Sequence, residues 1–240
     1  MNLDEMIQRL PGHLRERVHP FADRGRGGDL VVCWIHHANR TDENPLLEVA
    51  ADAARALQLP LVVHAGFGGF HPHANDRHTI FMLEGLRETQ ASLASHGIRM
   101  SVTPPTTPGR PSGLRQLANR ARLLVAEDQP VRPWPRRTAA IADCVPGEVM
   151  LVDTACVAPI RSIAGTHDRA FRFRSAAEAS WKERLDRDWP KASLDAPEAK
   201  TADLPNGTLD LASIDLGLTI GDWDIDHSIG PVPDLRGGMA

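Results

Sequence analysis

The 240-residue chain contains no tyrosine, only 5% aromatic residues and three cysteines. Cys33, Cys144 and Cys156 are an odd number without CxxC spacing, so we expect no disulfide framework and no paired-cysteine metal site. The sequence lacks the ~20 consecutive apolar residues that span a bilayer, and its first residues lack the apolar core of a secretory signal. The net charge of −4 gives no global attraction for polyanions. These absences predict a cytoplasmic protein without a membrane partner.

Alternating apolar runs and helical periods fill the middle of the chain. Hydrophobic residues make up 42% and charged residues 24%, which is typical of a folded globular protein. The expected strands are 30–35, 60–65, 98–102, 122–127 and 148–153, and the expected helices are 44–57, 77–96, 114–121 and 135–143. Strands that alternate with helices in this way predict an α/β fold, a doubly wound, Rossmann-like sheet of five parallel strands.

The two ends of the chain differ from this pattern. We predict an N-terminal extension at 1–29, the α/β domain at 30–190 and an irregular linker segment at 191–240. Prolines, acids and small residues replace any sustained period in the last segment. Because it has little apolar surface to offset chain entropy, we expect it to be poorly ordered by itself and to run over the surface of another domain.

A ligand site is expected beyond the carboxyl ends of the strands. In an open parallel sheet ligands bind where the strand order reverses. This rule selects the loops at 34–45, 66–78 and 128–134. Arginine side chains there suit an anionic group on a ligand, although ion pairs with neighbouring acids are an equal alternative.

Several motifs, taken in order, resemble the photolyase and cryptochrome family. The matching segments are the strand ending in Trp34 with an Arg-containing loop and Asn44, then Arg77-His78 with 81–86, Asp153 with Pro159, 171–174, and 225–233 with Gly237-Gly238. Their order resembles the amino-terminal α/β half of a class II-like DNA photolyase. One departure is His37-Ala38, where the family usually has Arg-Asp, so the interactions of that charged pair are not assumed here.

The resemblance implies an antenna domain that supports light-driven repair of cyclobutane pyrimidine dimers. It implies a deazaflavin or folate chromophore here, and FAD only in a helical partner half, from the same gene or a separate chain, through which damaged DNA is contacted. No catalytic residue is expected in this chain, which leaves open whether it is itself a lyase. The candidate cofactor-binding residues are Trp34, His36, Asn39, Arg40, Asn44, Arg77 and Asp128. For His36 a solvated loop position, and for Trp34 a core position, are the alternatives.

Other functions stay open at this point. A stand-alone small-molecule or nucleotide-binding module without repair activity would explain the altered loop. A metal-dependent hydrolase would use the histidines at 64, 71, 73 and 78, but a polar loop surface explains them as well, and we assign no metal ligand. The segment 66–71 begins like a dinucleotide fingerprint but lacks its last glycine.

Overall fold

A six-stranded sheet forms the centre of the protein in the computed structural model, which describes residues 1–67, 73–105, 112–163, 165–195 and 202–238. The strands are β1 (Val18–Asp23), β2 (Leu30–Trp34), β3 (Leu61–Gly66), β4 (Arg99–Thr103), β5 (Ala121–Glu127) and β6 (Glu148–Val152). Their order is β1-β6-β5-β2-β3-β4, and all neighbours run parallel except β1 and β6. The predicted parallel α/β sheet is therefore confirmed.

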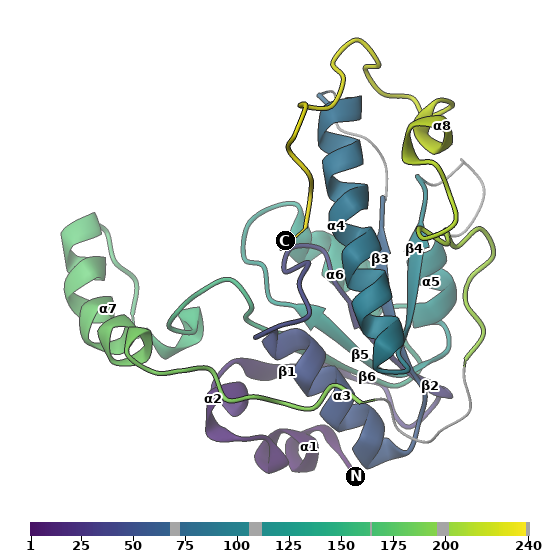
Figure 1. The fold of residues 1–240 in the computed structure, drawn as a ribbon. Coiled ribbons are helices and arrows are strands. Elements are labelled where there is room, and N and C mark those ends of the chain that lie inside the picture. Colours follow the sequence, from purple (N-terminus) through teal and green to yellow (C-terminus); the bar gives the residue numbers. More distant parts are fainter. Residues whose placement is uncertain (68–72, 106–111, 164, 196–201, 239–240) are drawn as a thin grey trace.

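Helices cover both faces of the sheet (Figure 1). The first face carries α1 (Leu3–Arg9), α2 (Gly12–Arg15), α3 (Pro45–Leu57) and α4 (Asp76–Ser95), and the second carries α5 (Gly113–Ala118) and α6 (Trp134–Ala142). Successive side chains of β2 serve alternate faces: Val31 and Cys33 lie in the core under α3 and α4, whereas Val32 lies in the core under α5. Burial on both faces explains why these strands are continuous apolar runs.

The sixth strand, β1, differs from the five predicted strands. It lies in the expected N-terminal extension and pairs antiparallel with β6 at the edge of the sheet. The segment is hard to recognise as a strand because it contains Pro20 and does not alternate regularly between buried and exposed positions. Proline is tolerated there because the outer side of an edge strand forms no hydrogen bonds to a neighbouring strand. The helix before it is also anchored, since Leu3 is buried and its amide donates to Glu148. Residues before Leu30 thus complete the sheet.

The C-terminal segment also packs more closely than expected. A short helix, α8 (Leu216–Ile220), lies beside α4, and Leu211 and Ile220 are buried in the core of that face. The expectation of poor order was wrong for this part, because a few spaced apolar side chains suffice when an existing core receives them. The role of the segment as a linker between domains stays a prediction.

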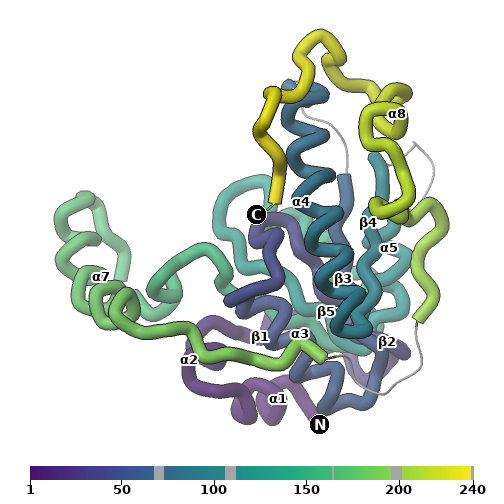
Figure 2. The backbone as a smooth tube through the Cα atoms, viewed as in Figure 1, coloured from purple at the N-terminus to yellow at the C-terminus, as the bar shows by residue number. Residues whose placement is uncertain are grey.

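Helix α7 (Ala170–Leu185), which follows the short 3-10 turn η1 (Ile160–Ser162), extends away from the sheet (Figure 2). Ala177 is its one buried residue, while Phe171 and Leu185 are each 59% exposed. Of the helices in the described part of the chain, none combines the length and apolar character of a membrane span.

Candidate ligand-binding site

A pocket of about 510 Å³ lies beyond the carboxyl ends of β2 and β3. Its described lining is Ile35, His36, His37, Asn39, Ala65, Gly66, Phe67, Ala74, His78, Thr79, Phe81, Met82, Gly85, Leu86, Trp134, Arg137 and Gly238. The strand order reverses at β2, because β3 and β4 follow on one side and β5 and β6 on the other. The pocket therefore lies at the edge and the switch point where the topology predicts a ligand, and its size suits a small molecule.

Glu127, at the end of β5, fixes the loop that forms one wall of this pocket. Its Oε2 accepts hydrogen bonds from the backbone amides of His36 (2.8 Å) and His37 (2.6 Å). Its Oε1 accepts from the amide of Ala38 (2.7 Å) and the hydroxyl of Thr154 (3.0 Å). Four donors thus compensate a carboxylate that is 1% exposed. Sequence reasoning missed this role, although an acid ending a buried strand beside a candidate loop was a usable signal.

His36 lies within an aromatic cluster at the same wall. Its ring stacks on Trp134 at 3.9 Å between ring centres with an interplanar angle of 7°, and it contacts the edge of Trp34 at 5.0 Å. The side chain is 4% exposed, and burial lowers the pKa of His36 to about 4, so the ring is neutral near pH 7. The guanidinium of Arg137 lies 5.2 Å from the centre of the Trp134 ring. The neutral ring of His36 and the ring of Trp134 thus stack closely at this wall, with the positive charge of Arg137 beside them.

Two buried polar atoms of the pocket lining lack a hydrogen-bond partner among the described residues. They are Nε2 of His36 and Oδ1 of Asn39. When Nδ1 of His36 donates its proton to Nδ1 of His37, 3.0 Å away, Nε2 is left as an acceptor, as is Oδ1 of Asn39. Unpaired acceptors in a dry site are costly and mark a place for a partner. A planar ligand with N–H or O–H groups along one edge would satisfy both.

His36, His37 and Glu127 also place three potential metal-ligand atoms within 4.8 Å of one another. The lone pairs of the Glu127 carboxylate are already occupied, since each oxygen accepts two hydrogen bonds. A metal ion would have to displace the backbone amides that hold the loop. The geometry of these three residues therefore supports a loop anchor.

The remaining candidate residues divide between support and other surfaces. Trp34 is 6% exposed and supports His36 from the core. Asn44 is fully buried, where its Oδ1 caps α3 by accepting from Leu46 (3.0 Å) and its Nδ2 donates to the carbonyls of Ala38 (3.0 Å) and Arg40 (2.7 Å). Asn44 thus shapes the loop from beneath.

The charged candidates lie outside the described lining of this pocket. Arg77 donates to the carbonyl of Gly230 (3.1 Å), in the C-terminal segment. Asp128 pairs with Arg161 (3.0 Å). Arg40 donates to the carbonyl of Glu43 (3.1 Å) and lines a different cavity. The structure therefore brings together Trp34, His36 and Asn39 and places the other four elsewhere, and a cofactor-binding role for all seven stays a prediction.

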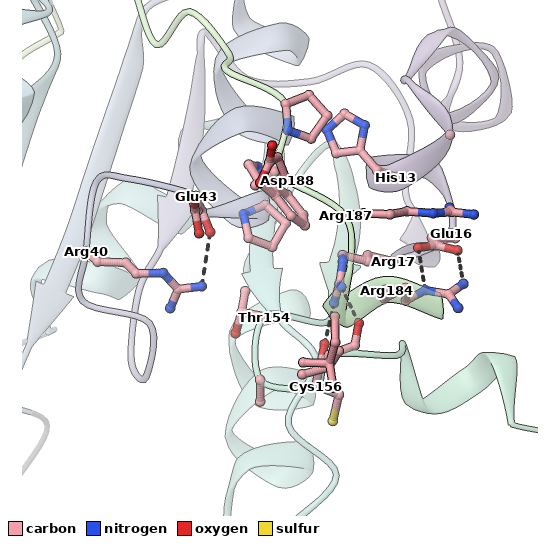
Figure 3. A pocket seen from close by; sticks show the side chains of 17 residues that line it. His13, Glu16, Arg17, Arg40, Glu43, Thr154, Cys156, Arg184, Arg187 and Asp188 are labelled. Carbon is pink, nitrogen blue, oxygen red and sulfur yellow. Dashed lines mark hydrogen bonds and ion pairs between the residues drawn. The ribbon is translucent and has the colours of Figure 1, made fainter. Parts of the chain in front are cut away.

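The second cavity, which Arg40 lines, has a volume of about 730 Å³ and lies between the loop after β2, α2 and the end of α7 (Figure 3). Its arginines already have partners: Arg184 forms two hydrogen bonds to Glu16 (3.1 and 2.5 Å), and Arg17 donates to the carbonyls of Cys156 (2.7 Å) and Val157 (2.8 Å). Nε2 of His13 and Nε of Arg17, which belong to this lining, also lack a hydrogen-bond partner among the described residues. We prefer the pocket beside His36 because it lies at the switch point of the sheet.

Comparison with known proteins agrees with the predicted resemblance. The family model described as DNA photolyase matches residues 31–198. A deoxyribodipyrimidine photo-lyase of Methanothermobacter thermautotrophicus is 37% identical over 81 residues, which are 34% of this chain and 18% of that protein. The match therefore spans less than a fifth of this relative.

A solved photolyase structure shares the fold. An archaeal photolyase from Sulfolobus tokodaii, described with two FAD molecules and an implied novel light-harvesting cofactor, matches with a TM-score of 0.56 at 14% identity. The match covers 88% of this chain and 44% of that one. A class III photolyase from Agrobacterium tumefaciens matches at 17% identity with a TM-score of 0.49, over 79% of this chain and 38% of that one.

Proposed function

Because this chain belongs to the DNA photolyase family, we propose that its α/β domain holds a light-harvesting chromophore in the pocket beside His36. The observation that carries this proposal is the pair of buried, unpaired polar atoms, Nε2 of His36 and Oδ1 of Asn39, in an otherwise mainly apolar pocket at the switch point of the sheet. Apolar walls with a few convergent polar groups are typical of small-molecule sites.

The chromophore we propose is a deazaflavin or a folate. Both classes are planar heteroaromatic rings that carry at least one ring N–H donor, which can pair with an acceptor of the pocket. The bound ring would absorb light and pass the excitation energy on. The task of the protein is to orient the ring and exclude water, for which the His36–Trp134 stack and the loop held by Glu127 are suited.

In the wider scheme the chain serves light-driven repair of cyclobutane pyrimidine dimers. We propose that a helical half, from the same gene or a separate chain, binds FAD and the damaged DNA. Our assignment gives this domain no acid, base or nucleophile, because the reaction proceeds by electron transfer from a reduced flavin to the flipped-out dimer. The comparisons support this scheme at the level of the family.

The experiment is a binding titration of the purified chain with a 5-deazaflavin, FMN and methenyltetrahydrofolate, followed by absorption and fluorescence. We expect a dissociation constant in the micromolar range or below for at least one probe, and a loss of about fivefold or more in His36→Ala, because a buried hydrogen bond and the stack are removed. His96→Ala, at the far end of α4, is the matched control. The proposal fails if none of the probes binds, or if His36→Ala binds as tightly as the wild type.

A further inference from the structure

The C-terminal strap, residues 225–238, runs along α4, as the yellow segment in Figure 1 shows. The first amides of a helix lack partners within the helix. In α4 the side chain of Asn75 accepts from the amide of His78 (3.0 Å), but the amides of Asp76 and Arg77 donate to the strap. Their acceptors are the carbonyls of Asp226 (3.2 Å) and Ile229 (3.0 Å). The strap therefore completes the N-terminal cap of α4.

Side chains reinforce this contact. Nδ1 of His227 lies 2.7 Å from Oδ1 of Asp76, and Nε of Arg77 donates to the carbonyl of Gly230 (3.1 Å). In return, the amide of Asp226 donates to the carbonyl of Ala74 (2.9 Å), a residue that lines the pocket. The strap and the first turn of α4 are thus bonded in both directions.

The far end of the strap lies directly against the middle of α4. The amide of Gly237 donates to Oε2 of Glu84 (2.8 Å). A Cβ atom at Gly237 would overlap the carbonyl oxygen of Phe81, and one at Gly85 would lie 3.4 Å from the amide of Gly238. Gly238 has a φ of +124°, which a side chain would strain. Glycines on both sides of the contact therefore allow the backbone to approach this closely.

This close contact is also a wall of the pocket. Gly238 belongs to the lining, together with Phe81 and Gly85 of α4, against which the strap packs. The Cβ position of Gly85 lies 3.1 Å from Nδ2 of Asn39, whose Oδ1 is one of the two unpaired acceptors. The strap, α4 and the polar end of the pocket are thus within a few ångströms of one another.

We propose that the C-terminal strap closes the ligand pocket and that its docking is coupled to ligand binding. Docking holds the first turn of α4 and places Gly238 in the wall, so a ligand that contacts this wall binds the docked state more tightly and stabilises it. The ligand part of this inference rests on the proposed function, whereas docking of the strap on α4 stands by itself.

The test uses Gly237→Ala in the full chain, with Gly230→Ala as the matched control, since a Cβ at Gly230 meets nothing within 4 Å. Hydrogen exchange is measured at the amides of Asp76 and Arg77. In Gly237→Ala we expect these amides to exchange at least tenfold faster. We also expect at least fivefold weaker binding of whichever probe, deazaflavin, FMN or folate, binds the wild type most tightly. The control should stay within twofold. Glu84→Ala removes only a side-chain acceptor, so it should accelerate exchange and weaken probe binding less than Gly237→Ala does.

Two results would overturn the proposal. Unchanged exchange in Gly237→Ala, measured on protein with wild-type circular dichroism, would show that the glycine contact does not hold the strap. Faster exchange with unchanged probe affinity would show that the strap docks without closing the pocket. If the wild type binds none of the probes, the proposed function and the coupling both fail, while exchange at Asp76 and Arg77 still decides whether the strap holds α4.

Discussion

Oε2 of Glu127 accepts a hydrogen bond of 2.8 Å from the amide of His36, and the same oxygen lies 3.1 Å from Nδ1 of the His36 ring. The first residue lies at the end of β5 and the second just after β2, which are neighbouring parallel strands. One buried carboxylate therefore ties two strand ends together and sets the position of the pocket wall. This relationship determines both the stability and the shape of the candidate site.

Glu127→Gln should destabilise the protein. The amide keeps the shape but turns one acceptor into a donor that faces backbone N–H groups, and it removes the charge that strengthens the remaining bonds. We expect a loss of about 2–4 kcal/mol in the free energy of unfolding, measured by urea denaturation. Glu178→Gln, on the surface of α7, is the control and should leave the free energy of unfolding close to that of the wild type. Equal effects in the two variants would mean that Glu127 does not organise the loop.

Trp134 should report ligand binding by its fluorescence. Its ring lines the pocket and stacks on His36, so a planar chromophore bound there would quench its emission. We expect that Trp134→Phe removes most of the quenching produced by a bound probe. Trp181→Phe, on the projecting helix α7, should leave that quenching unchanged. Quenching that persists in Trp134→Phe but disappears in another tryptophan variant would place the ligand elsewhere.

Arg122 should contribute strongly to the free energy of unfolding, although it is not part of the described pocket lining. Its guanidinium pairs at 2.5 Å with the carboxylate of Glu148, which is fully buried. Arg26 contacts the same carboxylate at 2.5 Å. Removal of one partner leaves a buried charge less compensated, so we expect Arg122→Ala to lower the free energy of unfolding by about 2 kcal/mol or more. Arg120→Ala breaks an exposed pair with Asp29 and an exposed 3.5 Å contact with the carbonyl of Asp203, and should cost less than about 1 kcal/mol. Similar thermal melting curves for both variants would contradict this prediction.

The local sequence pattern predicted correctly those helices and strands whose local preferences agree with their packing in the fold. The run at 30–35 became β2 because burial on both faces demands continuous apolar residues, and Asn44-Pro45 begins α3 as its capping chemistry predicts. The pattern failed at Val18–Asp23, where Pro20 and exposed positions resemble a loop and only the partner strand β6 makes the segment a strand.

The candidate site was predicted by topology and only in part by residue type. The rule on strand ends selected loops that contribute residues to the pocket, among them His36 and Asn39. Trp134 was included only as the last residue of the loop 128–134. Its stack on His36 joins residues 98 positions apart, so the sequence gives no local sign of it. The docking of the strap was not predicted because it also depends on residues far apart in the sequence. Gly237 and Gly238 were expected in an irregular linker, whereas their lack of side chains permits the contact with α4.

Docking of the strap should weaken as the pH rises. Asp76 raises the pKa of His227 through their hydrogen bond, with a further contribution from the carbonyl of Trp223, and Asp226 is the other nearby acid. A histidine whose pKa is raised in the folded state contributes stability that is fully present below its unfolded pKa of about 6.5 and is lost as the pH rises through the raised value. Protection of the Asp76 and Arg77 amides, corrected for intrinsic exchange rates, should therefore be greater at pH 6 than at pH 9. His227→Gln should abolish this difference and leave unchanged the exchange of β5, which β2 and β3 separate from β4, the strand against which α4 packs. If the pH dependence survives in His227→Gln, another group must control the strap, and the contact between His227 and Asp76 would then be incidental to docking.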